Sequence, residues 1–449
     1  MKEFIKKFIP GFILALYHKS LAVMADIFYG NPSGKLIVIG VTGTNGKSSA
    51  VNLIGRILEE AGQKVGWTSS INFKVGEKEW INDSKMTMLG RFKLQKLLKE
   101  MVKSGCRYAV IETSSEGIKQ FRHFGINYDI AVFTNLTPEH IESHGSFENY
   151  KKAKLELFRH TANFARKKIN GNKIKKISVV NIDDEHGADF LQFQTDEAWG
   201  YGIEDRGTAN ISRIVKAQNI EMNQGGVRFS VKGVEFNLKL LGEFNIYNSL
   251  TAICVALSQE IDLNVCKNAL EKVKGLPGRM EFIDEAQDFK VLVDYAPEPA
   301  SLEQLYKTIK LSNIQHPEYR TIHILGSCGG GRDIARRPVL GSIAAKNADI
   351  VIVTNEDPYD DIPSMIIDDV AEGAIKAGKI LNENLFKIED RGEAIKKAVG
   401  MASENDLIII TGKGCEQAIM VAKGKKIPWD DRVKMREAIR HKLQITNDK

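Results

Sequence analysis

The chain has 449 residues, of which 43% are hydrophobic and 27% are charged, a balance typical of globular proteins with more than one domain. Its net charge of +6 comes from 63 basic and 57 acidic residues spread without a basic block, which argues against nucleic acid as a partner. Five scattered cysteines without a CxxC pair exclude a typical zinc or redox motif and predict reduced thiols in the cytoplasm.

The first 33 residues differ from the rest of the chain. A basic start and an apolar body give residues 1–29 the look of a secretion signal, but Pro10, His18 and Lys19 interrupt the apolar run. We therefore expect no 18-residue stretch able to span a bilayer. One or two amphipathic helices that pack on the following domain are favoured over peripheral contact with a membrane surface.

Apolar runs of strand length alternate with segments of helical period through most of the chain. The runs are "KLIVIGV", "YAVIET", "DIAVFTNL" and "KISVVNID" in the first part, and "VLVDYA", "TIHILGS", "DIVIVTNED" and "DLIIITGKG" in the second. Continuous apolar strands separated by helices are typical of parallel sheets covered on both faces. The sequence therefore predicts an α/β protein.

Between these parts, residues 198–242 alternate polar and apolar residues and are expected to form antiparallel strands, followed by a helix at 245–260. The segment "KGLPGRM", residues 274–280, is the best linker candidate because it combines two glycines with a proline. We place a domain boundary at Lys274, which gives N-terminal helices at 1–33 and domains at 34–273 and 274–449.

The segment "GVTGTNGKSS", residues 40–49, joins a predicted strand to a predicted helix. Such a turn leaves backbone N–H groups in a concavity at the positive end of the helix, where phosphate binds. Lys47 adds a charge and Ser48 adds a hydroxyl suited to Mg²⁺. The general phosphate-loop pattern requires glycine where this chain has Val41, so the match is imperfect.

Two more candidate ligands follow neighbouring strands. Glu112 ends the run "YAVIET", and His140 lies just after "DIAVFTNL". Because the carboxyl ends of parallel strands converge on one crevice, both side chains can meet Ser48 there. A carboxylate and a hydroxyl suit Mg²⁺ well, and the imidazole is the least typical ligand for that ion.

Six motifs in order resemble those of the Mur ligase family, especially the branch that adds the third residue of the peptidoglycan stem peptide. They are "VTGTNGKSS", "TNLTPEHIESHGSFENYKKAKLELF", "LGEFNIYNSLTAICVAL", "LPGRMEF", "LVDYA" and "SCGGGRDIARRP". The resemblance covers residues 34 to 440. It implies a central ATPase domain with a phosphate loop and a mostly parallel sheet, followed by a C-terminal Rossmann-like α/β domain.

The resemblance also implies roles for individual residues. Catalysis would involve Lys47, Lys154, His140 and Arg279, with Lys154 carbamylated by CO₂ and so able to bind metal. The metal ligands would be Ser48, Glu112, His140 and Lys154. The nucleotide would be bound by Gly43, Thr44, Asn45, Gly46, Lys47, Ser48, Ser49, Asn245, Asn248, Arg279 and Asp294. The substrates would be bound by Thr87, Arg332, Asp333, Glu356, Asp357, Tyr359, Gly414 and Glu416.

The implied reaction is ATP-dependent formation of an amide bond in a monomeric enzyme. ATP and Mg²⁺ would convert the carboxylate of a muramyl peptide into an acyl phosphate, which the amine of an amino acid attacks. Such intermediates hydrolyse, so closure of the C-terminal domain is expected to exclude water, with residues 274–280 as the hinge.

The chain departs from the family pattern in three places. Only about 33 residues precede the first strand, so we expect no separate N-terminal domain for the UDP part of the substrate, and a lipid-linked muramyl peptide is an alternative acceptor. The DNPR motif of diaminopimelate-adding enzymes is replaced by "EDPY" at 356–359. Acidic residues there favour lysine or ornithine over diaminopimelate. Cys415 and Pro297 replace usual histidines, and Cys415 is expected to be a buried apolar residue.

Two other readings remain. A ligase similar to folylpolyglutamate synthetase would share the short N-terminus and the "TGTNGK" loop. A non-catalytic ATP-binding scaffold would be expected to lack one or more of Lys47, Glu112, His140 and Lys154, and this chain has all four. A dehydrogenase is excluded more firmly, because no acidic residue closes a strand after the glycine cluster in "GSCGGGRD" in the usual relation.

Overall fold

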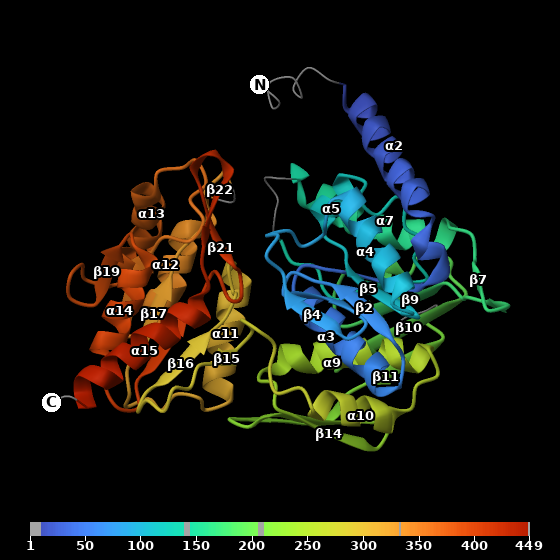
Figure 1. The fold of residues 1–449 in the computed structure, drawn as a ribbon. Coiled ribbons are helices and arrows are strands. Elements are labelled where there is room, and N and C mark those ends of the chain that lie inside the picture. The colour runs from blue at the N-terminus through green and yellow to red at the C-terminus, as the bar shows by residue number, and fades with distance from the viewer. Residues whose placement is uncertain (1–9, 139–143, 205–210, 332–333, 448–449) are drawn as a thin grey trace.

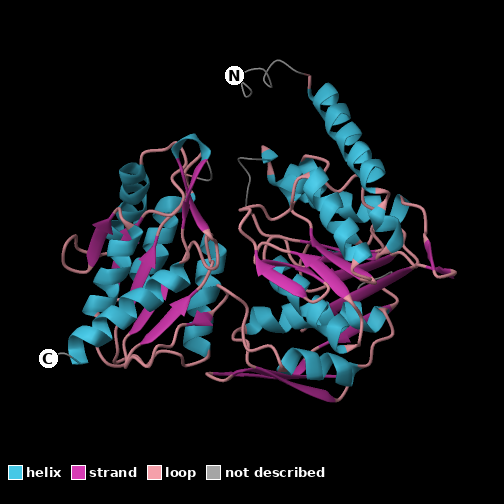
Figure 2. Ribbon diagram, in the orientation of Figure 1, coloured by secondary structure: helices cyan, strands magenta, loops and turns pink. Residues whose placement is uncertain are grey.

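The computed structural model describes residues 10–138, 144–204, 211–331 and 334–447. Two separate sheets form the frame of the molecule, one of nine strands in the first part of the chain and one of six in the second. Figure 1 shows each sheet with helices packed against it, and Figure 2 shows the same view by secondary structure. This arrangement confirms the predicted α/β class.

The elements of the first part run from residue 11 to residue 271. Its helices are α2 (Gly11–Tyr29), η1 (Pro32–Lys35), α3 (Lys47–Glu60), α4 (Arg91–Lys103), α5 (Ser115–Lys119), α7 (Phe147–Asn163), α8 (Gly187–Phe190), α9 (Glu243–Ser258) and α10 (Leu263–Glu271). Its strands are β1 (Ile37–Thr42), β2 (Val65–Thr68), β3 (Asn72–Val75), β4 (Lys78–Ile81), β5 (Tyr108–Glu112), β6 (Ile130–Phe133), β7 (Lys168–Ile169), β8 (Asn172–Lys173), β9 (Ile177–Asn181), β10 (Glu197–Gly202), β11 (Arg213–Lys216), β12 (Gln218–Asn223), β13 (Gly226–Val231) and β14 (Val234–Leu238).

The nine-stranded sheet has the order β11-β10-β9-β6-β1-β5-β2-β3-β4. Its strands from β11 to β2 pair in parallel, and β3 and β4 extend one edge as antiparallel strands. β1, β5 and β6 are buried along their whole length, as expected for apolar strands covered on both faces. Their carboxyl ends therefore meet at one edge near the middle of the sheet.

Helices cover both faces of this sheet (Figure 1). One core lies between the sheet and helices α3, α9 and α10, and it includes Trp67 and Leu250. The other lies between the sheet and helices α4, α5, α7 and α8, and it includes Tyr128 and Phe158. A small antiparallel sheet, β12-β13-β14, packs beside α10.

The second part of the chain contains a further sheet of six strands with the order β15-β16-β20-β17-β18-β19. Its strands are β15 (Glu281–Phe282), β16 (Lys290–Val293), β17 (Thr321–Leu325), β18 (Ile350–Thr354), β19 (Leu385–Ile388) and β20 (Leu407–Ile410), and β21 (Ala418–Val421) and β22 (Lys425–Pro428) form a separate hairpin. Its helices are α11 (Pro299–Leu311), α12 (Arg336–Asn347), α13 (Pro363–Lys376), α14 (Arg391–Met401), η2 (Ala422–Gly424) and α15 (Asp431–Asn447).

All strands of this sheet except β15 pair in parallel, and its two faces have separate cores. Helices α11, α12 and α13 cover one face, and α14 and α15 cover the other. The segment 272–280 connects the two parts. Gly278 has a φ of +62°, and an added Cβ would come within 2.2 Å of the backbone nitrogen of Cys415, so this close approach requires glycine.

Two expectations need correction. The predicted antiparallel region, 198–242, is wrong at its start, because β10 and β11 belong to the parallel sheet and only β12, β13 and β14 form antiparallel pairs. We also expected no stretch able to span a bilayer. By length and composition alone this is wrong, because α2 is long and apolar enough to cross a membrane. Pro10 precedes this helix instead of interrupting it, and Gly30 ends it in the left-handed conformation.

Candidate functional site

The loop at residues 43–46 connects β1 to α3 at the carboxyl edge of the nine-stranded sheet. Gly43 has a φ of +151°, and a Cβ there would come within 1.9 Å of the Thr134 hydroxyl. Gly46 adopts the left-handed conformation, with a φ of +79°, directly before the first turn of α3. Both glycines are required by the shape of the loop, which presents the N-terminus of α3 to whatever lies in front of it.

The loop is held in place by the segment that follows β6. The backbone nitrogen of Thr44 donates to the carbonyl of Asn135 at 2.8 Å, and that of Asn45 donates to the Asn135 side-chain oxygen at 2.8 Å. The Thr134 hydroxyl donates to the carbonyl of Asn45 at 2.7 Å. These bonds fix the loop from the neighbouring strand before any ligand arrives.

Ser48 and Glu112 meet as the strand order requires. The Ser48 hydroxyl donates to Oε2 of Glu112 at 2.8 Å, and both residues are buried. Ser70 holds the same carboxylate, with its backbone nitrogen 2.6 Å from Oε2 and its hydroxyl 3.1 Å from Oε1. The hydroxyl oxygens of Ser70 and Thr87 lie 3.1 Å apart. A hydroxyl and a carboxylate are thus fixed beside the N-terminus of α3.

Two lysines lie at the phosphate loop. Nζ of Lys47 donates to the carbonyl of Thr44 at 2.7 Å. Lys154, 1% exposed on α7, donates to the carbonyl of Gly43 at 2.5 Å and lies 4.2 Å from the centre of the Tyr150 ring. The predicted lysine of the family motif is therefore brought to the loop from a helix more than 100 residues further along the chain.

In front of the loop lies a cavity of about 530 Å³, lined by both parts of the chain. Eleven of the residues predicted to bind nucleotide, metal or substrate line it: Thr44, Asn45, Gly46, Lys47, Ser48, Ser49, Thr87, Glu112, Asn248, Arg279 and Asp294. Asn245 is buried behind it, and its side-chain oxygen accepts a hydrogen bond of 3.0 Å from the Asn248 amide.

The second part of the chain contributes a charged wall to this cavity. The guanidinium of Arg279 lies 4.4 Å from the centre of the Tyr295 ring. Asp294 accepts from the backbone nitrogens of Met280 at 2.7 Å and Ala296 at 2.9 Å, and burial raises the pKa of its carboxyl above the ordinary value despite nearby Arg279. This wall faces the phosphate loop.

Comparison with known proteins shows the family. The profile described as "Mur ligase middle domain" matches residues 41–256, and "Mur ligase, glutamate ligase domain" matches residues 278–414. A UDP-N-acetylmuramyl-tripeptide synthetase of Roseiflexus sp. (strain RS-1) is 37% identical over 428 residues, which cover 94% of this chain and 82% of that protein.

The chain belongs to the Mur ligase family. A UDP-N-acetylmuramoyl-L-alanyl-D-glutamate--2,6-diaminopimelate ligase of Clostridium tetani is 36% identical over 94% of this chain and 81% of that protein. Like other Mur ligases, the protein is an ATP-dependent enzyme that forms carbon–nitrogen bonds and uses Mg²⁺. The predicted resemblance and enzyme class are confirmed.

Solved structures give the same fold. A structure of a UDP-N-acetylmuramoyl-L-alanyl-D-glutamate--2,6-diaminopimelate ligase is 29% identical and has a TM-score of 0.57, covering 91% of this chain and 79% of that one. Folylpolyglutamate synthase of Mycobacterium tuberculosis has a TM-score of 0.64 at 16% identity, covering 88% of this chain and 92% of that one. At this identity the second likeness shows the fold alone.

The predicted acidic pocket of this Mur ligase is largely neutralised by the chain's own cations. Asp357 lies 2.8 Å from Nζ of Lys413 and 2.7 Å from Nζ of Lys85. Asp361 pairs with Arg337 at 3.3 Å. Residues distant in sequence therefore supply counter-charges to these two carboxylates.

The other predicted substrate residues lie behind or beside the cavity wall. Glu356 is buried and accepts from the thiol of Cys328 at 3.0 Å, and Gly414 packs against Gly278 of the linker. Tyr359, with a φ of +53°, donates its backbone nitrogen to the hairpin strand β21 at 3.1 Å. Glu416 contacts both lysines that neutralise Asp357. Predicted residues His140, Arg332 and Asp333 lie outside the described residues.

Several residues of the site were missed by sequence reasoning. Ser70 supports Glu112 through its backbone nitrogen and hydroxyl, and no quoted motif includes it. Asn135 supports the phosphate loop and lies within the quoted motif that begins "TNLTPEH", but no role was assigned to it. Glu298 pairs with Arg336 inside the cavity wall. Lys413 lies within the quoted run "DLIIITGKG", three residues before Glu416, so its proximity to Glu416 was available as a signal. Cys415 is buried as expected, and burial raises the pKa of its thiol.

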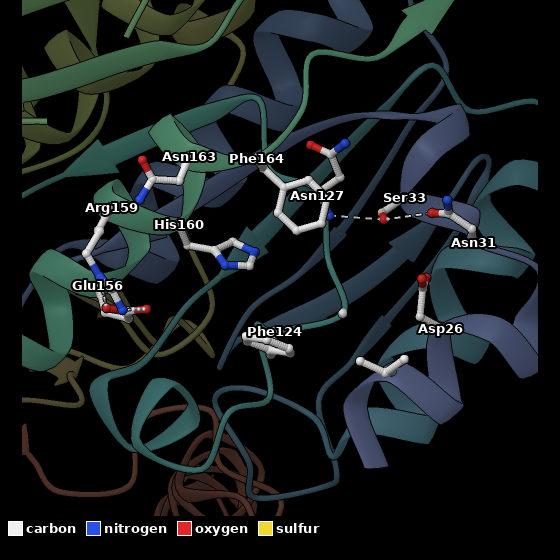
Figure 3. Close-up of a pocket in the computed structure, with 12 residues that line it drawn as sticks. Asp26, Asn31, Ser33, Phe124, Asn127, Glu156, Arg159, His160, Asn163 and Phe164 are labelled. Atoms are coloured by element: carbon white, nitrogen blue, oxygen red, sulfur yellow. Dashed lines mark hydrogen bonds and ion pairs between the residues drawn. The ribbon is translucent and has the colours of Figure 1, made fainter. Parts of the chain in front are cut away.

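A second cavity, of about 450 Å³, lies between α2 and the C-terminal half of α7 (Figure 3). Asp26, His160 and Phe164 are among the side chains around it, and the Asn127 backbone nitrogen donates to the Ser33 hydroxyl at 3.1 Å. It contains none of the residues predicted for the reaction. The predicted residues that line a cavity are therefore at the phosphate loop.

Proposed function

We propose that the protein adds an amino acid, a diamino acid such as lysine or ornithine, to the carboxylate of a muramyl peptide through an acyl phosphate. The observation that carries this proposal is the shared cavity, in which the loop at 43–46, the Ser48–Glu112 pair and Arg279 of the second domain face one another. The names of the relatives point to UDP-linked muramyl peptides as acceptors.

The donor groups at the loop fit Mg²⁺. Ser48 and Glu112 offer oxygen atoms, the type of ligand that this ion prefers, and phosphate oxygens and water can complete its shell. Among the described residues no group of three His, Cys, Asp or Glu side chains is placed to hold a metal ion. His140, which lies outside those residues, and a carbamylated Lys154 are the further ligands that the family resemblance implies. When bound, Mg²⁺ neutralises charge on the phosphates during transfer.

The residues around the cavity divide the reaction between them. Lys47 and the N-terminus of α3 bind the triphosphate, and Asn248, Arg279 and Asp294 bind the rest of the nucleotide. The acceptor carboxylate attacks the terminal phosphorus, and ADP leaves. The amine of the amino acid then attacks the acyl carbon, loses a proton, and displaces inorganic phosphate, which leaves an amide.

We propose that Lys154 is carbamylated in the active enzyme. Its amine is buried beside the phosphate loop, within reach of the Gly43 carbonyl. After the ammonium loses a proton, the amine nitrogen bonds to the carbon of CO₂ and releases a second proton. The product is a carbamate anion that can bind metal, as the family resemblance implies. Carbamylation would explain why a lysine lies beside Lys47, where a second positive charge would add little to phosphate binding.

We further propose that the chain works as two domains, 34–273 and 274–449, that close around the cavity with residues 274–280 as the hinge. Thr87, Glu356, Asp357, Tyr359, Gly414 and Glu416 would bind acceptor and amino acid in the closed state, together with His140, Arg332 and Asp333. Closure protects the acyl phosphate from water. The enzyme is proposed to be a cytoplasmic monomer.

Residues 1–29 are proposed to contact a membrane surface peripherally. Eight large apolar residues of α2 are each at least 41% exposed: Phe12, Ile13, Leu16, Tyr17, Val23, Met24, Ile27 and Phe28. At 100° per residue they occupy one arc of about 160°, in which Ser20 is the single polar residue. Lys2, Lys6 and Lys7 precede this arc in the sequence. An apolar arc next to basic residues suits an anionic lipid surface.

Sedimentation with vesicles of phosphatidylglycerol and phosphatidylethanolamine tests this contact. The double variant Leu16→Glu, Ile27→Glu is expected to lower the bound fraction at least tenfold, because each change removes a buried leucine or isoleucine from lipid. The matched control, Ile362→Glu with Met365→Glu, alters two apolar residues of the C-terminal domain that are 59% and 60% exposed, against 65% and 71% for Leu16 and Ile27. Equal binding of all three proteins would contradict the proposal, and a dimer broken by the first variant would assign the arc to self-association.

Phosphate release tests the proposed reaction. The full chain is incubated with ATP, Mg²⁺, a muramyl dipeptide acceptor in UDP-linked or lipid-linked form, and a panel of lysine, ornithine and diaminopimelate. Release that requires both acceptor and amino acid supports the proposal. Release with folate and glutamate instead would favour a folylpolyglutamate synthetase activity, and nucleotide binding without release under any condition would favour a scaffold.

A further inference from the structure

Two carboxylates of the C-terminal domain already bind two ammonium groups. Asp357 follows β18 and Glu416 follows β20, and Nζ of Lys413 lies 2.8 Å from a carboxylate oxygen of each. Nζ of Lys85 contacts the same two carboxylates, at 2.7 Å from Asp357. Burial raises the pKa of the Asp357 carboxyl, but the opposite effect of Lys413 and Lys85 is larger. The pKa therefore lies below its ordinary value.

The two lysines differ in origin. Lys413 belongs to the same domain as the carboxylates, only three residues before Glu416, and its side chain is 0% exposed. Lys85 comes from the central domain, 272 residues before Asp357, and reaches across the interface with a side chain that is 7% exposed. One ammonium is therefore a fixed part of the site, whereas the other is present only when the two domains meet.

The loop that carries Lys85 is built to present it. The Asn82 side chain donates to the carbonyl of Met86 at 3.0 Å and accepts from the backbone nitrogen of Ser84 at 2.9 Å. Lys85 itself has a φ of +57°, a conformation that lysine rarely adopts. Two residues later Thr87 lines the cavity, so this loop connects the carboxylate pair to the proposed acceptor site.

The carboxylate pair lies just behind the cavity wall. The charge of Glu416 is the largest influence that raises the pKa of Tyr295, and Tyr295 lines the cavity. Cys328, which also lines the cavity, forms an isolated parallel β-bridge with Asp357 through the backbone. Tyr295 and Cys328 therefore connect the carboxylate pair to the cavity.

We propose that Lys85 is a specificity-determining residue whose ammonium occupies the site of the distal ammonium of the incoming diamino acid and must be displaced by it. This inference rests on the proposed function for the identity of the amino acid. With Lys85 in place, two ammonium groups balance two carboxylates, and a third cation gains little. With Lys85 displaced, one carboxylate charge is left for the substrate.

The alternative role for Lys85 is a simple bond between the domains, and the chain offers a matched control for that role. Lys426, on β22, also crosses the interface, with Nζ 3.5 Å from the carbonyl of Asp83 and 3.3 Å from that of Ser84. It contacts the same loop as Lys85 but touches neither carboxylate. A loss of contact between the domains affects both lysines, whereas competition involves only Lys85.

The test is calorimetric titration of L-lysine and its uncharged analogue L-norleucine into the full chain loaded with a non-hydrolysable ATP analogue. Lys85→Met, which keeps the apolar stem and removes the charge, is compared with Lys426→Met and the wild type. A site that is blocked nine-tenths of the time binds its ligand about tenfold more weakly. Lys85→Met is therefore expected to bind lysine roughly tenfold more tightly, with norleucine affinity unchanged.

The outcomes are distinct. Tighter binding of lysine by Lys85→Met alone supports the proposal, and addition of Glu416→Gln to this variant should reverse the gain. Lysine affinity that is unchanged or lower in Lys85→Met overturns it, as does an equal change in both lysine variants. Because binding is measured without turnover, these results hold whether or not phosphate release supports the proposed function. Lys85→Gln gives a second test if the methionine variant fails to fold.

Discussion

The two sides of the cavity solve opposite problems with charge. On the central-domain side, residues Thr44–Gly46 of the loop and Lys47, Ser48 and Ser49 at the N-terminus of α3 line the cavity. On the C-terminal side, charged residues are paired with each other, as in Arg336 with Glu298 and Lys413 with Asp357. The first side can bind a polyanion such as a triphosphate. The charges of the second side nearly cancel as long as these ion pairs stay intact. Substitutions should therefore reduce the reaction rate on the first side and stability or selectivity on the second.

The largest effect is expected for Lys47→Ala. Removal of the ammonium at the N-terminus of α3 takes away a charge that acts on the transferred phosphate, so kcat should fall about a thousandfold or more. Stability should change by no more than about 1 kcal/mol, because the Nζ bond to the Thr44 carbonyl is partly buried and local. Phosphate release and thermal denaturation measure the two quantities. A large loss of stability with a normal rate in the remaining folded protein would break the comparison.

A somewhat smaller effect is expected for Lys154→Ala. Loss of the proposed carbamate should lower kcat by about a hundredfold to a thousandfold, and short carboxylic acids such as acetate should restore part of the rate. The matched control is Lys151→Ala on the same helix, whose ammonium pairs with Asp189 at 3.1 Å away from the loop. Phosphate release is measured with and without added acid. If acetate fails to raise the rate of Lys154→Ala, the lysine acts as an amine and carbamylation is the wrong explanation.

The central-domain side could be predicted from the sequence because its determinants are local. A buried strand, a glycine turn and a helix place Lys47 and Ser48 whatever the rest of the chain does. Glu112 could be added because parallel strands end at a common edge, and the structure indeed places its carboxylate 2.8 Å from the Ser48 hydroxyl.

The C-terminal side could not be predicted in the same way. The acidic run at 356–361 is visible in the sequence, but its charge depends on Lys85 and Arg337, which no periodic pattern connects to it. Contacts between domains depend on how two separately formed cores meet, and a single sequence contains no signal for that distance. The exposed arc of α2 shows a related limit, because Pro10 counts as an interruption until its place before the helix is known.

The smallest effect that distinguishes the two sides concerns Glu298 and Arg336. Both residues are less than 9% exposed, and Glu298 overcomes the effect of burial and raises the pKa of Arg336 above its ordinary value. Glu298→Gln leaves the guanidinium buried without its counter-ion, so stability should fall by about 3 kcal/mol. The double variant Glu298→Gln, Arg336→Met removes both charges and should recover most of the loss. Thermal denaturation of the four proteins forms a double-mutant cycle. If the double variant is as unstable as the single one, the two side chains stabilise the fold by packing and not by neutralising each other. The explanation of the C-terminal wall by charge balance would then be wrong.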